Sequence, residues 1–121
     1  MPISKGVQSM DKVVKIKLSE PLTTLGGITL TELTADFGKI KTRDLSLINK
    51  VSRRLKGGED FDFGNLSKAA DAEFRIAVTW VAVLKSTNGV SLDDIDSLSL
   101  ADCLEMGNYS LPFLVKISSA S

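Results

Sequence analysis

The sequence predicts an α+β fold in which an N-terminal antiparallel β-hairpin precedes a compact unit of three to four α-helices. Apolar and polar residues alternate with a period of two over residues 12–18, as in a β-strand. After residue 42 the apolar residues instead recur every three to four positions, as in an α-helix. The length of 121 residues suits one hydrophobic core. We expect a flexible tail over residues 1–11, a single domain over 12–115 and a second flexible tail over 116–121.

The hairpin is predicted from two strand-like segments separated by turn residues. Residues 12–18 alternate between an apolar face and a lysine-rich face, as expected for a half-buried strand. Pro21 and the glycine pair at 26–27 break this pattern, and residues 28–33 resume it with Thr and β-branched side chains. Two leucines of the connection are expected to project from it, Leu22 and Leu25.

The first helix is expected from Thr42, as N-cap, to about Leu55, with Asp44 in its first turn. Its apolar stripe consists of Leu45, Ile48, Val51 and Leu55.

A second helix is expected to begin near Asn65 or Ser67 and to end at about Ser86, before a stop signal at Asn88-Gly89. Its later half is apolar nearly all round, which indicates a central core helix with Trp80 inside the core.

Two further helical segments are expected near the C-terminus. A short acidic helix follows Ser91, and a last helix capped by Ser99 runs through Met106 to a stop at Gly107-Asn108. The apolar segment that follows, residues 109–116, either packs on the core or forms a surface that captures a partner.

The side-chain chemistry argues against an enzyme. The chain has no histidine, so Ser-His and Cys-His catalysis and imidazole zinc sites are unavailable to it. Cys103 is the single cysteine and is expected in the core. The acidic run Asp93, Asp94 and Asp96 lacks the spacing of a calcium loop and is interpreted as a solvated helix start. Asp60 and Asp62 are interpreted as part of a solvent-facing loop, since Gly64 occupies the next expected ligand position. We expect no metal, no cofactor and no catalytic residue.

Charge is divided unevenly along the chain. Residues 1–58 carry 11 basic and 5 acidic residues, whereas residues 59–121 carry 4 and 10. The basic side chains of the 42–56 helix raise an alternative function, a small nucleic-acid-binding protein, because phosphate binding needs clustered positive charge. These residues are Arg43, Lys50, Arg53, Arg54 and Lys56. The neutral total charge and the lack of interleaved aromatic residues favour a solvated or protein-docking face.

No apolar run is long enough to cross a bilayer, and the N-terminus lacks the pattern of a signal peptide. We therefore expect a cytoplasmic protein that does not enter a membrane.

The order of short motifs carries a family resemblance. KIKLSEP at 15–21, GGI at 26–28, TELT at 31–34 and TRDL at 42–45 follow one another along the hairpin and the first helix, and LSLAD and LPFL come later, at 98–102 and 111–114. In this order the sequence resembles the tail assembly chaperones of contractile-tailed bacteriophages, the Mu-like and P2-like group, from which it departs at residues 35–38.

The resemblance implies a non-enzymatic protein that binds the tape measure protein, shields its hydrophobic segments and leaves as the tail tube polymerises. If the chain is phage-encoded, the location would be the host cytoplasm. The tail tube protein and a second copy of this chain are further candidate partners, whereas nucleic acid is disfavoured. From apolarity and charge, the expected partner-facing residues are Leu111, Phe113, Leu114 and Val115, together with Arg53, Arg54 and Lys56.

Overall fold

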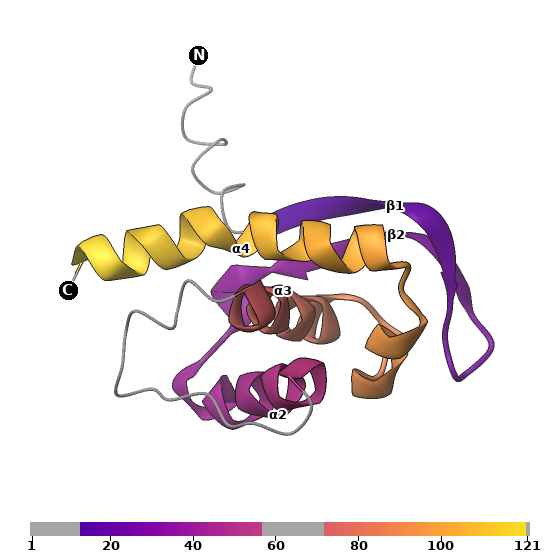
Figure 1. Cartoon of the computed structure of the whole chain (residues 1–121), viewed down its shortest axis with the longest axis horizontal. Helices are drawn as coiled ribbons and strands as arrows, with labels where there is room; N and C mark the ends of the chain where they lie inside the picture. The colour runs from indigo at the N-terminus through magenta and orange to yellow at the C-terminus, as the bar shows by residue number, and fades with distance from the viewer. Residues whose placement is uncertain (1–12, 57–71, 121) are drawn as a thin grey trace, which may run out of the picture.

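The computed structural model describes residues 13–56 and 72–120, with side chains over 13–55 and 72–114. It confirms the α+β class (Figure 1). The elements are the strands β1 (Val13–Thr23) and β2 (Thr29–Asp36), the helices α2 (Leu45–Lys56), α3 (Ala72–Ser86) and α4 (Leu100–Ala120), and the short 3-10 segments η1 (Phe37–Lys39), η2 (Thr42–Asp44) and η4 (Leu92–Ser97). Three predicted features lie outside the described residues: the flexible tail at residues 1–11, the acidic loop at Asp60 and Asp62, and the start of the second helix.

The predicted hairpin is present, and its strands pair antiparallel with Ile16 opposite Leu33. Both of these side chains are buried, while the lysines of β1 face solvent, so the alternation fixes which face meets the core. The register shifts between Lys17 and Leu22, where Pro21 cannot donate to the ladder. Beyond that irregularity β1 continues, and Leu22 turns inward with 1% of its surface exposed. The expectation that Leu22 projects from the loop is therefore wrong, whereas Leu25 does project.

The helix α2 begins later than the sequence suggested. Residues 42–44 form the 3-10 segment η2 with Lys41 at its N-cap, so Thr42 is not the capping residue. Asp44 is buried and accepts hydrogen bonds from the Lys41 N–H and the Lys85 ammonium, each at 2.7 Å. The bond from Lys85 and then the bond from Lys41 hold the pKa of Asp44 below its usual range.

The core-facing stripe of α2 is shorter than expected. Ile48 and Val51 are buried and Leu55 is half-buried, but Leu45 is 42% exposed. Leu45 is the first residue of α2.

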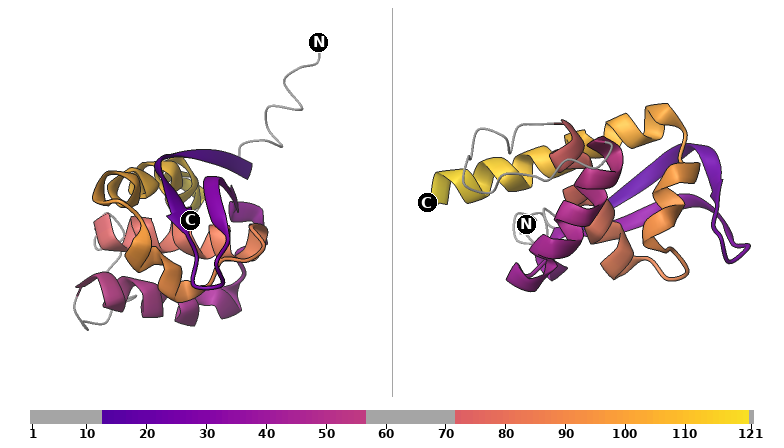
Figure 2. Two further views of the ribbon diagram at one scale, coloured as in Figure 1. Left: turned by 90° about the vertical axis from the view of Figure 1, so that its right-hand side faces the viewer. Right: turned by 60° about the horizontal axis from the view of Figure 1, so that its bottom comes forward.

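The helix α3 is the centre of the molecule. Figures 1 and 2 show it between α2 on one side and α4 with the hairpin on the other. Nine of its residues are buried, from Phe74 to Val83, which confirms the prediction of a core helix. Trp80 is fully buried, and its indole N–H donates to the Leu92 carbonyl at 3.1 Å. This hydrogen bond joins the first residue of η4 to the core helix.

The last helix does not stop at Gly107-Asn108. Instead, α4 continues through Pro112 to Ala120, into the 116–121 range expected as a flexible tail. Packing on α3 outweighs the stop signals: Met106 is buried, and its carbonyl accepts a 2.6 Å hydrogen bond from the Thr79 hydroxyl. The missing N–H of Pro112 leaves the Asn108 carbonyl without its helical partner at an exposed position, where water can hydrate it.

One glycine is required by its backbone conformation. Gly89 has φ +85°, and a Cβ at this position would lie 2.7 Å from Cδ1 of Ile28 in the hairpin loop. Gly89→Ala is expected to lower the free energy of unfolding by about 1–2 kcal/mol, because it adds left-handed backbone strain, while the exposed end of the Ile28 side chain can move away. Urea unfolding followed by circular dichroism measures the change.

Gly26→Ala is the matched control, since its nearest contact would be an ordinary 3.8 Å from the Thr24 hydroxyl and its φ is not positive. Equal stability losses in both variants would contradict the interpretation of Gly89.

Candidate interaction surface

The structure does not bring the two groups of predicted partner-facing residues together. Leu111, Phe113, Leu114 and Val115 lie on α4, whereas Arg53, Arg54 and Lys56 lie on α2. The core helix α3 separates α2 from α4, as Figure 1 and the left view of Figure 2 show. A single partner site made of all seven residues is therefore not formed within one copy.

The four predicted apolar residues of α4 have different environments. Leu111 is 45% exposed, and Leu114 is half-buried against the core. Phe113 stacks on Phe37 of η1, with ring centroids 5.3 Å apart and an interplanar angle of 24°. Phe113 thus anchors α4 to the end of the hairpin, and Leu111 faces outward. The side chain of Val115 lies outside the described set.

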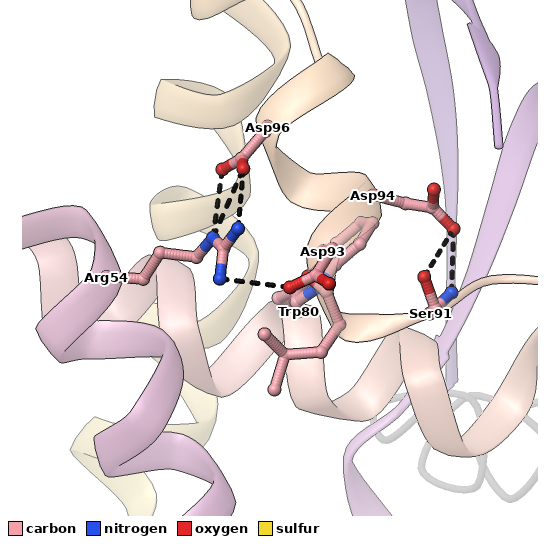
Figure 3. Close-up of polar contacts among 7 residues, drawn as sticks. Arg54, Trp80, Ser91, Asp93, Asp94 and Asp96 are labelled. Atoms are coloured by element: carbon pink, nitrogen blue, oxygen red, sulfur yellow. Dashed lines mark hydrogen bonds and ion pairs between the residues drawn. The ribbon is translucent and has the colours of Figure 1, made fainter. Parts of the chain in front are cut away.

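On the basic face of α2, Arg54 is paired with acidic residues of the same chain. Arg54 forms ion pairs with Asp93 at 2.9 Å and Asp96 at 2.8 Å, and its Nε also donates to Asp96 (Figure 3). The hydrogen bond from Arg54 lowers the pKa of Asp96. All three side chains are largely exposed, so these pairs contribute little stability. Their main effect is to neutralise the part of the basic face that meets η4.

Three other basic residues of this helix region remain exposed, Arg43, Lys50 and Arg53, while the side chain of Lys56 is outside the described set. The positive surface is therefore narrower than the sequence suggested, and it borders the acidic η4. This arrangement weakens the nucleic-acid alternative, because phosphate binding depends on a continuous positive field.

The acidic run of η4 does not form a cation site. Asp94 is 1% exposed and turns inward, where it accepts hydrogen bonds from the Ser91 and Leu25 backbone N–H groups at 2.7 and 2.8 Å. Asp93 and Asp96 point instead toward Arg54 (Figure 3). Within residues 13–56 and 72–120, no group of three potential metal ligands is present. The interpretation of a solvated helix start is wrong for Asp94, which joins η4 to the hairpin loop.

An exposed leucine face on α4 was only partly identified from the sequence. Leu100, Leu104 and Leu111 are 74%, 55% and 45% exposed, and we call these three residues the leucine stripe. Residues four and eleven positions apart fall within about 40° of one another on a helix. The sequence predicts a helix that ends at Met106. Leu100 and Leu104 were therefore not expected to lie on the same helix face as Leu111.

The surroundings of the leucine stripe carry little charge. The other exposed residues of α4 up to residue 114 are Ala101, Glu105, Asn108 and Pro112, so Glu105 is the single exposed charge on this part of the helix. Cys103 is half-buried beside the core, and burial raises the pKa of its thiol. The exposed face of α4 is thus mostly apolar, and the Arg75 side chain of α3 lies beside it at Gly107. Exposed apolar residues that lie together are typical of a surface that another protein covers.

The opposite face of α4 is held by polar bonds as well as by apolar packing. The Asp102 carboxylate accepts the Ser19 N–H at 2.9 Å and the Glu20 N–H at 3.3 Å, at the irregularity of β1. The Ser110 hydroxyl donates to the Arg75 carbonyl of α3 at 2.9 Å. These contacts fix the rotation of α4 about its axis. Gly107 is buried against Ile76 and Arg75 of α3 and lies on the same side of the helix as the leucine stripe, so the stripe follows the edge of the exposed face.

Comparison with known protein families, curated proteins and solved structures finds no match for this chain. Among the described helices, none combines the length and apolarity that a bilayer crossing requires. The features that bear on function are therefore the leucine stripe of α4 and the order of motifs in the sequence.

The Asp102 bonds give a testable pH dependence. Burial acts to raise the pKa of Asp102, but hydrogen bonds from Ser19, Ser99 and Glu20 together hold it below the usual value. A lowered pKa means that the carboxylate stabilises the fold above about pH 4 and that this contribution disappears as the pH falls further. Asp102→Asn is expected to cost about 1.5–3 kcal/mol at pH 7, and the gap to wild type should shrink in acid. Urea unfolding at several pH values measures both.

Asp96→Asn serves as the control, because its exposed pair with Arg54 is expected to contribute no more than about 1 kcal/mol. A loss at Asp102 that does not change with pH would show that the charge is not the stabilising feature.

Proposed function

We propose that this chain is a non-enzymatic phage tail assembly chaperone that binds the tape measure protein and keeps it soluble while the tail tube assembles, in the cytoplasm of the host cell. The observation that carries the proposal is the leucine stripe, three exposed leucines along one side of α4. The order of motifs from KIKLSEP to LPFL supports the choice of family. Together they favour a protein whose task is to cover another protein's apolar surface.

The size of the stripe suits reversible binding. Full burial of a leucine contributes about 1.5–3 kcal/mol, so covering the exposed fractions of Leu100, Leu104 and Leu111 contributes about 3–5 kcal/mol. Association costs about 4–15 kcal/mol in lost freedom of movement. The stripe alone therefore gives weak binding, and the partner must contribute apolar area of its own. Weak binding is what a chaperone needs if it is to leave when the tube polymerises.

Co-expression tests the proposal. We expect the tape measure protein encoded with this chain to be recovered in a soluble complex, and Leu104→Glu to lower the recovered complex at least about tenfold. A charge in the centre of the apolar stripe removes about 1.4 kcal/mol or more of binding free energy, which corresponds to that factor. Affinity purification followed by quantitative gel analysis measures it.

Lys50→Glu is the control for a charge change on α2, away from the stripe, and it should leave the recovered complex unchanged. Circular dichroism must show that both variants fold. The proposal fails if the two wild-type proteins are each folded and soluble yet do not co-purify, or if Leu104→Glu binds as well as wild type.

The alternative of nucleic-acid binding has its own test. Because Arg54 is paired with Asp93 and Asp96, we expect no measurable binding of DNA or RNA at about 0.15 M salt. Fluorescence anisotropy with labelled oligonucleotides, repeated at low salt, measures this. Tight binding that falls steeply with salt and is lost in a Lys50→Glu variant would favour the alternative instead.

A further inference from the structure

The turn between α3 and η4 contains an asparagine followed directly by a glycine, Asn88-Gly89. Both residues are exposed, and both lie beyond Ser86, the last residue of α3. In such a pair the backbone nitrogen of the glycine can attack the side-chain amide carbon of the asparagine, because the glycine has no Cβ to hinder the approach. The turn thus has the residue pair and the exposure that spontaneous deamidation needs.

The attacking nitrogen is available in the folded chain. The last backbone donor that continues the pattern of α3 is Thr87, whose N–H donates to the Val83 carbonyl at 2.8 Å. Within residues 13–56 and 72–120, neither the Gly89 N–H nor the Asn88 carboxamide has a hydrogen-bond partner. The carboxamide can therefore turn onto the Gly89 nitrogen without breaking a hydrogen bond.

The backbone of the turn keeps the reactive pair together. Gly89 has φ +85°, a conformation in which a side chain would add strain. The turn therefore needs a glycine at this position, and glycine is also the neighbour that hinders attack on Asn88 least.

We infer that Asn88 is a site of spontaneous deamidation in the folded protein, with water as the co-reactant. The Gly89 nitrogen gives up its proton to the solvent and bonds to Cγ of Asn88. The bond from Cγ to the side-chain nitrogen breaks, and that nitrogen takes a proton from water and leaves as ammonia. Water then opens the cyclic imide at either of its two carbonyl carbons. The products are an aspartate and an isoaspartate, whose side-chain carbon has become part of the main chain.

The position of the turn gives this modification a structural consequence. On one side, the Thr87 hydroxyl accepts the Thr34 N–H at 2.9 Å and donates to the Thr34 carbonyl at 2.8 Å. On the other side, the Ser91 N–H donates to buried Asp94 at 2.7 Å. Only residues 88–90 connect these two anchors. An isoaspartate adds one carbon to this short connection, so one of the anchors must shift or the turn must distort.

Both products also add a negative charge. The charge lies beyond the C-terminal end of α3, where the helix dipole is itself negative. The Lys85 ammonium, which could offset it, already pairs with Asp44 at 2.7 Å. We therefore expect the modified chain to unfold at a lower urea concentration than the unmodified chain.

Peptide mapping of the full chain by mass spectrometry tests the inference. The protein is incubated in mildly alkaline buffer, prepared with water that carries heavy oxygen, and the oxygen label should enter at residue 88 because opening of the imide takes its oxygen from water. Asn108 is the internal control. It is exposed on α4, but Tyr109 follows it within the helix, so Asn108 should keep its amide.

A comparison of rates shows whether the folded state itself reacts. The native chain should be labelled within about tenfold of the rate of the urea-unfolded chain, whereas a reaction that required global unfolding would be slowed about a thousandfold or more. Asn88→Gln should lose the label, because its longer side chain closes the ring less readily. The inference is overturned if residue 88 keeps its amide as long as Asn108 does, or if the native chain reacts only as fast as global unfolding allows.

Urea unfolding of the modified chain tests the structural consequence. A midpoint that falls further than that of a fresh Asn88→Asp variant would assign the loss to the lengthened main chain, and an equal fall would assign it to the charge. An unchanged midpoint would overturn the consequence.

Discussion

Burial of α3 on every side is the constraint on which the rest of the structure depends. A helix that is apolar all round cannot lie at a surface, so other elements must enclose it. Here α2, the hairpin, η4 and α4 each cover one part of it (Figure 1). Trp80 at its centre is fully buried, and its N–H reaches the carbonyl of Leu92, so even the polar atom of the largest core side chain is satisfied.

Three buried aspartates join these enclosing elements to one another. Asp44 links the start of α2 to Lys85 at the end of α3, Asp94 links η4 to the hairpin loop at Leu25, and Asp102 links α4 to β1. In each case the carboxylate accepts backbone N–H groups that would otherwise be unpaired where a strand or helix is irregular. In the sequence these acids resemble a solvated helix start or a cap. In the structure their carboxylates hold the elements together.

The same packing gives α4 two faces with different roles. Met106 and Ser110 lie against α3, and Phe113 stacks on Phe37, so this side of the helix cannot rotate freely. The leucine stripe is therefore presented by a rigid helix and not by a loop. Because α4 is already ordered, this chain loses less conformational entropy on binding, which matters for a surface whose apolar area is modest. The ion pairs of Arg54 with η4 likewise direct the basic side of the molecule toward its own acidic segment, away from an external ligand.

The sequence by itself determined the hairpin, the core helix and the turn at Gly89, because strand alternation, all-round apolarity and glycine conformation are local properties of the chain. Tertiary structure alone decided that α4 continues through Gly107 and Pro112, since the gain from packing on α3 exceeds the local cost of both residues. It also decided the direction of Leu22 and Asp94, which depends on partners far along the chain. The leucine stripe needed both: the leucines are visible in the sequence, but only the uninterrupted helix places them on one face.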